Sequence, residues 1–399
     1  MQNIIIDKPY HFVAPHKSNF WPRALQALLP LYLSRNYGIA SIEFRGVAHL
    51  ETSLANGSAV ALTPNHCRPC DPMVLALLSR KMGRPFHYMA SWHVFMQGKL
   101  QAWIINRLGA FSVYREGIDR EAIRAATDIL VEGRRPLVLF PEGVVSRTND
   151  VLRPFMEGIS LIVGAALKRR ETLSLAGSVA IHPVAIKYRL LTDAEPSLHQ
   201  VLDEIEARFC WQRRDLPLVE RIVKVGEALL ALKEIEYFGR VQTGEIDERL
   251  QQLIDHILNR LEMKWIVGRR QPNFMGRVKA LRAAILKDML ALELPRQARE
   301  ARWRDLSEIY FAVQLSSYPA FYVRSNPTPE RLTETVERFE EDTTDKTRVH
   351  GRWHVILQIG EPIMVDSNGG RSHACLSKRL QETVQQMLDA IDHRREAAA

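Results

Sequence analysis

The sequence is poor in cysteine and has no long uninterrupted apolar run. Only four cysteines occur among 399 residues, at positions 67, 70, 210 and 375. The N-terminus shows no basic stretch followed by an apolar core, so we expect no secretory signal and no disulfides. The longest apolar stretches, such as residues 24–33, span roughly half of the ~20 residues that a bilayer-crossing helix needs. We therefore expect a cytoplasmic protein, in solution or held peripherally at a membrane surface.

Metal and redox chemistry have weak support in the sequence. Cys67 and Cys70 form a Cys-x-x-Cys pair, but a structural zinc site needs four ligands and the sequence offers no second close pair. We therefore expect neither a bound metal nor a cofactor.

What the chain does have is a globular composition with a localised positive charge. Hydrophobic residues make up 46% and charged residues 25% of the sequence, which allows one large domain or two ordinary ones. The net charge is +8, and the segment from Lys264 to Arg304 alone carries an equal excess of Lys and Arg over acids. Such a cluster attracts anionic lipid or nucleic acid. It is equally typical of a helical face whose charges pair with acidic helices, and both readings remain open.

The first half of the chain alternates between strand and helix patterns. We expect strands at 42–44, 59–63, 86–90, 110–114, 137–140 and 179–188, and helices at 72–81, 101–107, 120–132 and 155–168. Strands that alternate with helices of ten or more residues indicate an α/β fold with a largely parallel sheet. Active sites of such sheets gather at the carboxyl ends of the strands.

The pattern predicts four parts of the chain. Residues 1–38 form an amphipathic helical segment, whose apolar spacing from Trp21 to Leu33 suits either a membrane interface or packing on the next domain. Residues 39–194 form the α/β domain. Residues 195–348 read as helices and form an insertion or a second subdomain. Residues 349–399 return to strand and helix character, and they either complete the first domain or form a separate C-terminal domain.

A histidine and an aspartate at the end of one predicted strand have the parts of a general-base pair. His66 and Asp71 lie in the sequence Asn65-His-Cys-Arg-Pro-Cys-Asp71, directly after the apolar run 60–64. Asp71 can accept the proton on one ring nitrogen, so that the other nitrogen takes a proton from a substrate hydroxyl. The spacing alone is weak evidence, since many such pairs are only satisfied polar residues.

Three further blocks follow in order. They are Gly-Ala-Phe-Ser-Val-Tyr-Arg from Gly109 to Arg115, Phe-Pro-Glu-Gly from Phe140 to Gly143, and Ile-His-Pro-Val-Ala from Ile181 to Ala185. With the first block, they resemble the glycerolipid acyltransferase family, which includes glycerol-3-phosphate and 1-acylglycerol-3-phosphate acyltransferases. The resemblance covers roughly residues 39–191.

The resemblance implies a membrane-associated enzyme of phospholipid biosynthesis. Its donor is acyl-CoA or acyl carrier protein, its acceptor is a glycerophosphate-type lyso-lipid, and nucleic acid is not an expected partner. His66 is implied as the general base and Asp71 as the residue that orients it. The implied acceptor-binding residues are Gly109, Arg115, Glu142, Gly143 and Arg147.

One position departs from the family pattern. Many members read Glu-Gly-x-Arg-Ser-Arg after Phe-Pro, whereas this chain has Val145 in place of the first arginine and keeps Arg147. One phosphate contact is therefore in doubt. Three hypotheses remain: acyl transfer to a glycerophosphate acceptor, acyl transfer to a lipid without a phosphate, and a non-catalytic protein that binds lipid or nucleic acid through its basic helices.

Overall fold

The computed structural model describes residues 8–212, 215–266, 268, 271, 273–291, 293–318, 321–365 and 373–396. The chain divides into two compact units. The α/β unit consists of His11–Tyr114, Asp119–Thr192 and Gly351–Ala399. The helical unit consists of Met1–Tyr10, Arg115–Ile118 and Asp193–His350.

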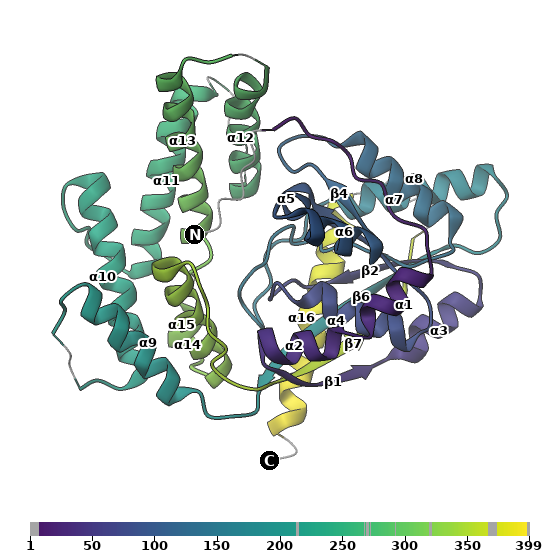
Figure 1. Ribbon diagram of the computed structural model, residues 1–399, viewed down its shortest axis with the longest axis horizontal. Helices are drawn as coiled ribbons and strands as arrows, with labels where there is room; N and C mark the ends of the chain where they lie inside the picture. The colour runs from purple at the N-terminus through teal and green to yellow at the C-terminus, as the bar shows by residue number, and fades with distance from the viewer. Residues whose placement is uncertain are drawn as a thin grey trace. The chain divides into compact units, whose positions relative to one another are not determined.

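The α/β unit is built on a mostly parallel sheet of eight strands (Figure 1). Its main path runs β1 (Ile39–Arg45), β7 (Trp353–Ile359), β6 (Val179–Leu190), β2 (Ala59–Pro64), β5 (Leu137–Val138), β3 (His87–Ser91) and β4 (Ala110–Val113). A short strand, β8 (Ile363–Met364), also pairs with β6. Strands β7 and β8 run antiparallel to β6, and the other pairs are parallel. The predicted α/β class is confirmed.

Helices of the α/β unit begin and end where the local sequence directs them. They are α1 (Phe20–Gln26), α2 (Leu29–Tyr37), α3 (Val47–Ala55), α4 (Asp71–Lys81), α5 (Trp92–Met96), α6 (Lys99–Arg107), α7 (Arg120–Glu132), α8 (Gly158–Thr172) and α16 (His373–Glu396). Helix α7 shows the signals most clearly. The Asp119 side chain accepts the Ala122 amide at its start, and Gly133 ends it in the left-handed conformation.

The core of this unit surrounds the central strand β2, all of whose residues are buried. Helix α7 packs on β2 and α8, and α16 packs on α8 and β6. Side chains from these elements form one apolar cluster that includes Phe111, Leu130, Ile181 and Leu388. A strand covered on both faces needs a continuous apolar run rather than an alternating one, as residues 59–62 provide.

The helical unit contains α9 (Glu195–Arg208), α10 (Leu218–Phe238), α11 (Ile246–Trp265), α12 (Phe274–Ala291), α13 (Arg296–Leu315), α14 (Phe321–Ser325) and α15 (Pro329–Thr344). Helices α10 to α13 share a second apolar cluster, centred on residues such as Leu258 and Ile285. Helix α10 lies within the span 195–348 that the sequence predicts to be helical, although its apolar side chains do not follow one stripe.

Many cations of the basic segment 264–304 contact acids of their own unit. Arg277 lies 2.6 Å from Asp255 and 2.7 Å from Glu262. Lys264 lies 2.5 Å from Asp305, and Arg296 pairs with Glu300 at 2.7 Å. Arg269 and Arg270 lie outside the described residues. For the cations paired in this way, the contacts favour a helical face whose charges are neutralised within the unit. They do not favour a face that binds a membrane.

Gly109 stands at a close approach of two backbones, at the turn from α6 to β4. Its φ is +103°, and a Cβ added there would lie 2.3 Å from the carbonyl oxygen of Phe86. The Gly109 carbonyl accepts the amide of Tyr88 at 3.2 Å and contacts the His87 ring at 3.0 Å. These contacts account for the glycine through the fold alone.

Gly109→Ala is therefore expected to lower the free energy of unfolding by more than about 2 kcal/mol, because backbone strain of about 1–3 kcal/mol adds to a backbone clash. Gly83→Ala is the matched control: its φ is +63°, and nothing lies within 4 Å of its added Cβ. We expect it to cost about 1–2 kcal/mol, the strain of a left-handed backbone for a residue with a Cβ. Urea unfolding followed by circular dichroism measures both, and equal losses would contradict this account of Gly109.

Candidate active site

Two asparagines tie loops to strand β6: Asn65 holds the loop that carries His66, and Asn149 holds the loop after β5. The β2–β6 ladder ends at the pair of Pro64 and Val184. Beyond it, the Asn65 side chain accepts the amide of Ile186 at 2.7 Å and donates to its carbonyl at 3.0 Å. Asn149 makes the same pair of bonds with Tyr188, both at 2.7 Å. These side chains continue the ladder where the backbone of β2 has turned away.

His66 and Asp71 form the predicted pair. The Nδ1 atom of His66 lies 2.8 Å from Oδ2 of Asp71, and the Arg68 amide donates to the same oxygen at 2.9 Å. Asp71 is the first residue of α4 and is fully buried, while the His66 side chain keeps 15% of its surface exposed. The buried carboxylate at a helix N-terminus thus holds a ring that solvent reaches.

Tyr188 completes the coordination of this carboxylate. Its hydroxyl donates to Oδ1 of Asp71 at 2.6 Å and lies 3.3 Å from the sulfur of Cys70. Burial, followed by the charge of Asp71, raises the pKa of Tyr188 well above its ordinary value. Tyr188 was not predicted from the sequence. A signal was available in β6, because side chains alternate between the two faces of a strand. Tyr188 follows Ile186 by two residues and therefore lies on the same face.

Glu142 holds the backbone of the His66 loop. One carboxylate oxygen accepts the amide of His66 at 2.6 Å, and the other accepts the amide of Arg153 at 2.9 Å. Burial raises the pKa of Glu142 from its ordinary value of 4.5 to about 7, although both backbone hydrogen bonds oppose this shift. Glu142 therefore bonds directly to the loop that carries His66.

The remaining contacts of His66 come from the same segment. Its ring stacks on Phe140 at a centroid distance of 4.1 Å, and its carbonyl accepts the amide of Ser146 at 2.7 Å. The Phe-Pro-Glu-Gly block and the residues just after it therefore hold the ring, the amide and the carbonyl of one histidine. That is a physical reason for two motifs far apart in the sequence to occur together.

Gly143 and Arg147 lie on this loop, with Val145 between them. Gly143 has φ +71°, and an added Cβ would lie 2.1 Å from the end of the Met156 side chain. Arg147 adopts φ +62°, unusual for a residue with a side chain. Its charge acts on Tyr37, whose pKa is nevertheless raised by burial. Arg147 directly follows Ser146, whose amide bonds to the His66 carbonyl, while position 145 carries no charge.

Arg115 belongs to the helical unit, as does Glu116. Burial, and then repulsion from Arg282, lower the pKa of Arg115 to about 10. Of the residues predicted for the site, the α/β unit gathers His66, Asp71, Glu142, Gly143 and Arg147. Gly109 lies at the turn before β4.

Cys67 and Cys70, which belong to the same sequence block as His66 and Asp71, are both buried, and their contacts are with neighbouring groups of the fold. Burial, and then the neighbouring Asp71, raise the pKa of Cys70 to about 12, which keeps its thiol protonated at neutral pH. The Cys67 thiol lies 3.8 Å from the Ile186 carbonyl. Within the described ranges, no three His, Cys, Asp or Glu side chains are grouped to hold a metal ion.

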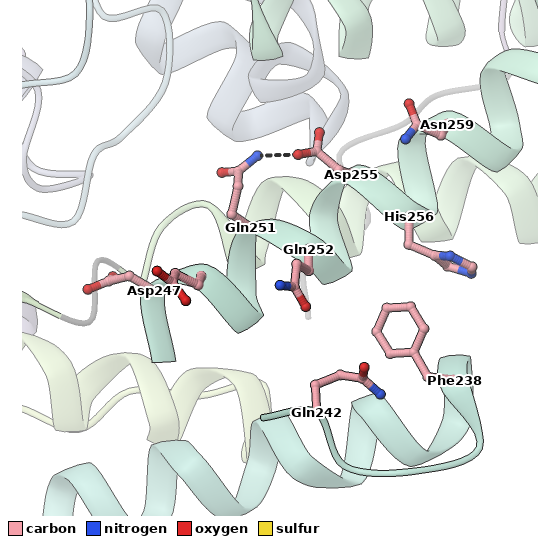
Figure 2. Close-up of a pocket in the computed structure, with 9 residues that line it drawn as sticks. Phe238, Gln242, Asp247, Gln251, Gln252, Asp255, His256 and Asn259 are labelled. Carbon is pink, nitrogen blue, oxygen red and sulfur yellow. Dashed lines mark hydrogen bonds between the residues drawn. The ribbon is translucent and has the colours of Figure 1, made fainter. Parts of the chain in front are cut away.

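A shallow hollow of about 820 Å³ lies on the helical unit, between the end of α10 and α11 (Figure 2). Its charged lining is acidic, from Asp247, Glu248 and Asp255. Asp255 is already bonded to Gln251 at 2.9 Å and to Arg277 at 2.6 Å. With acids and amides in its wall, this hollow does not complement an anionic substrate.

Comparison with known proteins agrees with this geometry. Residues 42–187, from β1 to β6, match the protein family described as Acyltransferase, and the matched segment contains His66, Asp71 and Glu142. A search of curated protein sequences finds no match. The match supports a glycerolipid acyltransferase assignment for residues 42–187.

Proposed function

We propose that the protein is a membrane-surface O-acyltransferase that moves a fatty acyl group from acyl-CoA or acyl carrier protein to a glycerophosphate-type acceptor. The observation that carries this proposal is the His66–Asp71 contact of 2.8 Å within an acyltransferase domain. A carboxylate bonded to one ring nitrogen makes the other an acceptor for a hydroxyl proton.

The reaction needs one proton transfer in each direction. With Nδ1–H donated to Asp71, Nε2 of His66 takes the proton of the acceptor hydroxyl as its oxygen attacks the thioester carbonyl. The tetrahedral intermediate then collapses, the carbon–sulfur bond breaks, and the thiolate leaves with the proton from His66. The products are an ester and a free thiol, and no covalent acyl-enzyme is required.

The acceptor is the least constrained part of the proposal. Arg147 remains to contact a phosphate, whereas Val145 offers no charge where many family members have arginine. The valine favours a second candidate with the same chemistry, in which the acceptor is a lipid alcohol without a phosphate.

A surface for membrane attachment is available on the α/β unit. Exposed apolar side chains project from three of its helices: Phe20 of α1, Leu31 and Tyr32 of α2, and Leu100 and Trp103 of α6. Helix α1 contacts both α2 and α6, and Trp21 packs edge-on against Trp103 at 4.9 Å. These side chains suit the interfacial region of a bilayer.

The charge of the same surface fits an anionic bilayer. Residues 8–42 and 72–115 contain no Asp or Glu, and Arg23, Arg35 and Lys99 are exposed there. Across the described part of the chain, no helix is both long and apolar enough to cross a membrane. We therefore propose peripheral attachment at the inner face of the cytoplasmic membrane through α1, α2 and α6.

Purified protein incubated with labelled acyl-CoA or acyl carrier protein should form one acylated product from a panel of lyso-lipids. The panel pairs each phosphorylated acceptor with its neutral counterpart, such as lysophosphatidate with monoacylglycerol, and mass spectrometry identifies the product. His66→Ala should lower the rate at least about 10²-fold, because it removes the base. Transfer that survives in His66→Ala would contradict the mechanism, and product only from neutral acceptors would establish the second candidate.

The raised pKa of Glu142 predicts that the free energy of unfolding depends on pH. Its carboxyl in the folded protein keeps a proton up to about pH 7, whereas the unfolded chain loses it near 4.5. The wild-type unfolding free energy should therefore fall relative to that of Glu142→Gln as the pH rises from 4.5 to 7, by up to about 3 kcal/mol, and then level off. Urea unfolding of both proteins across pH 4–9 measures this difference. A difference that rises with pH would contradict burial as the dominant effect on Glu142.

If α1, α2 and α6 attach the protein to a membrane, a variant with three of their surface leucines changed should lose vesicle binding. Leu28→Glu, Leu31→Glu and Leu100→Glu alter side chains that are 66%, 59% and 71% exposed. Co-sedimentation with phosphatidylglycerol vesicles should fall at least about tenfold, since each leucine loses apolar burial in the bilayer.

The matched control changes Leu161, Leu173 and Leu191 to glutamate, three other exposed leucines of the same unit, and should bind vesicles as the wild type does. Equal losses in the two triple variants would show a general charge effect and contradict the proposed surface.

A further inference from the structure

Tyr188 belongs to a series of buried hydrogen bonds that ends at His66. Its hydroxyl donates to Oδ1 of Asp71 at 2.6 Å, and Nδ1 of His66 lies 2.8 Å from Oδ2. At the other end, the sulfur of Cys70 lies 3.3 Å from the Tyr188 oxygen. Burial raises the pKa of Cys70 to about 12, so the thiol keeps its proton and can donate to that oxygen. Every proton in the series therefore points toward one carboxylate.

Contacts on the ring of Tyr188 fix the place of its hydroxyl. Tyr188 has no exposed surface, and the guanidinium of Arg68 lies 5.2 Å from its ring centre. The same guanidinium lies 4.0 Å from the ring of Trp353, which packs edge-on against Tyr188 at 6.5 Å. Contacts between a guanidinium and an aromatic ring are attractive at such distances. Trp353 begins β7, so a residue beyond the matched segment 42–187 supports the site.

The charge of Asp71 has two opposite effects on His66. A buried carboxylate holds the histidine through Nδ1, but it also favours the doubly protonated ring, which cannot accept a proton from an alcohol. Each hydrogen bond that the carboxylate receives from elsewhere makes it a weaker base and reduces this second effect. Asp71 receives such bonds from Tyr188 and, at 2.9 Å, from the Arg68 amide. The bond from Tyr188 comes from a side chain, so a single substitution removes it.

We propose that Tyr188 is a positioning residue that keeps Nε2 of His66 free of a proton at neutral pH, by sharing the charge of Asp71. This inference rests on the proposed function, in which Nε2 takes the proton of the acceptor hydroxyl. Tyr188 is fully buried, so it acts through Asp71 and not on a substrate. The inference also gives Cys70 a place in the site, as the donor behind Tyr188.

Other titratable groups lie around the same series of bonds. The Cys67 thiol lies 4.0 Å from Oδ1 of Asp71. Burial, and then smaller effects that include Cys70, raise the pKa of Tyr37 on α2, so this phenol stays neutral. Burial raises the pKa of Glu142 to about 7, and Asp71 adds to this shift. Glu142 therefore changes charge in the pH range in which a histidine titrates. Its effect is common to the wild type and the variants, so the test compares them with one another.

The first test observes His66 directly, without turnover. Full-length protein with isotope-labelled histidine is titrated by nitrogen NMR, and the His66 signals are those absent from His66→Ala. Tyr188→Phe should raise the midpoint pH at which Nε2 takes up a proton, by about one pH unit, because a hydrogen bond to a charged group is lost.

Tyr88→Phe is the matched control. Tyr88 is a buried tyrosine on β3 of the same sheet, and its hydroxyl has no hydrogen-bond partner among the described residues. Loss of this hydroxyl should leave the His66 midpoint where it is in the wild type. An equal rise in Tyr88→Phe and Tyr188→Phe would show a general effect of the sheet and overturn the proposal.

A better donor at position 188 provides a test of opposite sign. Incorporation of a ring-fluorinated tyrosine there makes the phenol more acidic and strengthens its bond to Asp71, so the midpoint should fall below that of the wild type. This protein keeps the ring and its hydroxyl, so it tests the proposal even where Tyr188→Phe is unstable. A purely structural role for Tyr188 predicts the same midpoint in all three proteins, and that result would overturn the proposal.

Kinetics separate this inference from the proposed function. In Tyr188→Phe, kcat/KM should fall about tenfold below the shifted midpoint and return to the wild-type value near pH ~9, where Nε2 has lost its proton in both proteins. A loss of the same size at every pH would show a structural role, which overturns the inference while transfer itself stands. A midpoint that depends on Tyr188 in a protein without acyl transfer would retain the effect on His66 and remove the enzymatic function.

Discussion

The site depends on one buried carboxylate. Asp71 has no exposed surface, and a buried charge is tolerated only when its oxygens are fully hydrogen-bonded. Oδ2 accepts from His66 and from the Arg68 amide, and Oδ1 accepts from Tyr188. The same bonds that make the burial of Asp71 possible fix the direction in which His66 presents its second nitrogen. The hydrogen bonds that stabilise the buried carboxylate are therefore the same bonds that the proposed chemistry needs to orient His66.

Around this carboxylate, the fold supplies rigidity from three separate strands. Asn65 ties the loop after β2 to β6, Tyr188 reaches Asp71 from β6 itself, and Glu142 follows β5. Parallel strands end at a common edge, so short loops after each of them can meet. A histidine held in this way would need little reorganisation to act as the proposed base, which is the condition for efficient proton transfer.

The sequence predicted the α/β class because buried parallel strands have a recognisable continuous apolar pattern, and residues 59–63 show it. The contact between His66 and Asp71 followed from a motif with local spacing. Tyr188 could not be identified in this way, because its contact with Asp71 depends on how β6 aligns with a helix more than a hundred residues earlier. The placement of β7 between β1 and β6, parallel to β1 and antiparallel to β6, is likewise a long-range property. The pairing of Arg282 with Glu116 joins α12 to a short segment far earlier in the chain.

The most direct measurement of the central claim is the steady-state kinetics of Asp71→Asn with acyl donor and acceptor both varied. Asparagine keeps the shape of the side chain but removes the charge that orients and polarises His66. The account predicts that kcat falls at least about 10²-fold while both KM values stay within about threefold, because Asp71 acts through His66 and touches neither substrate. A wild-type kcat, or a loss expressed mainly in KM, would contradict it.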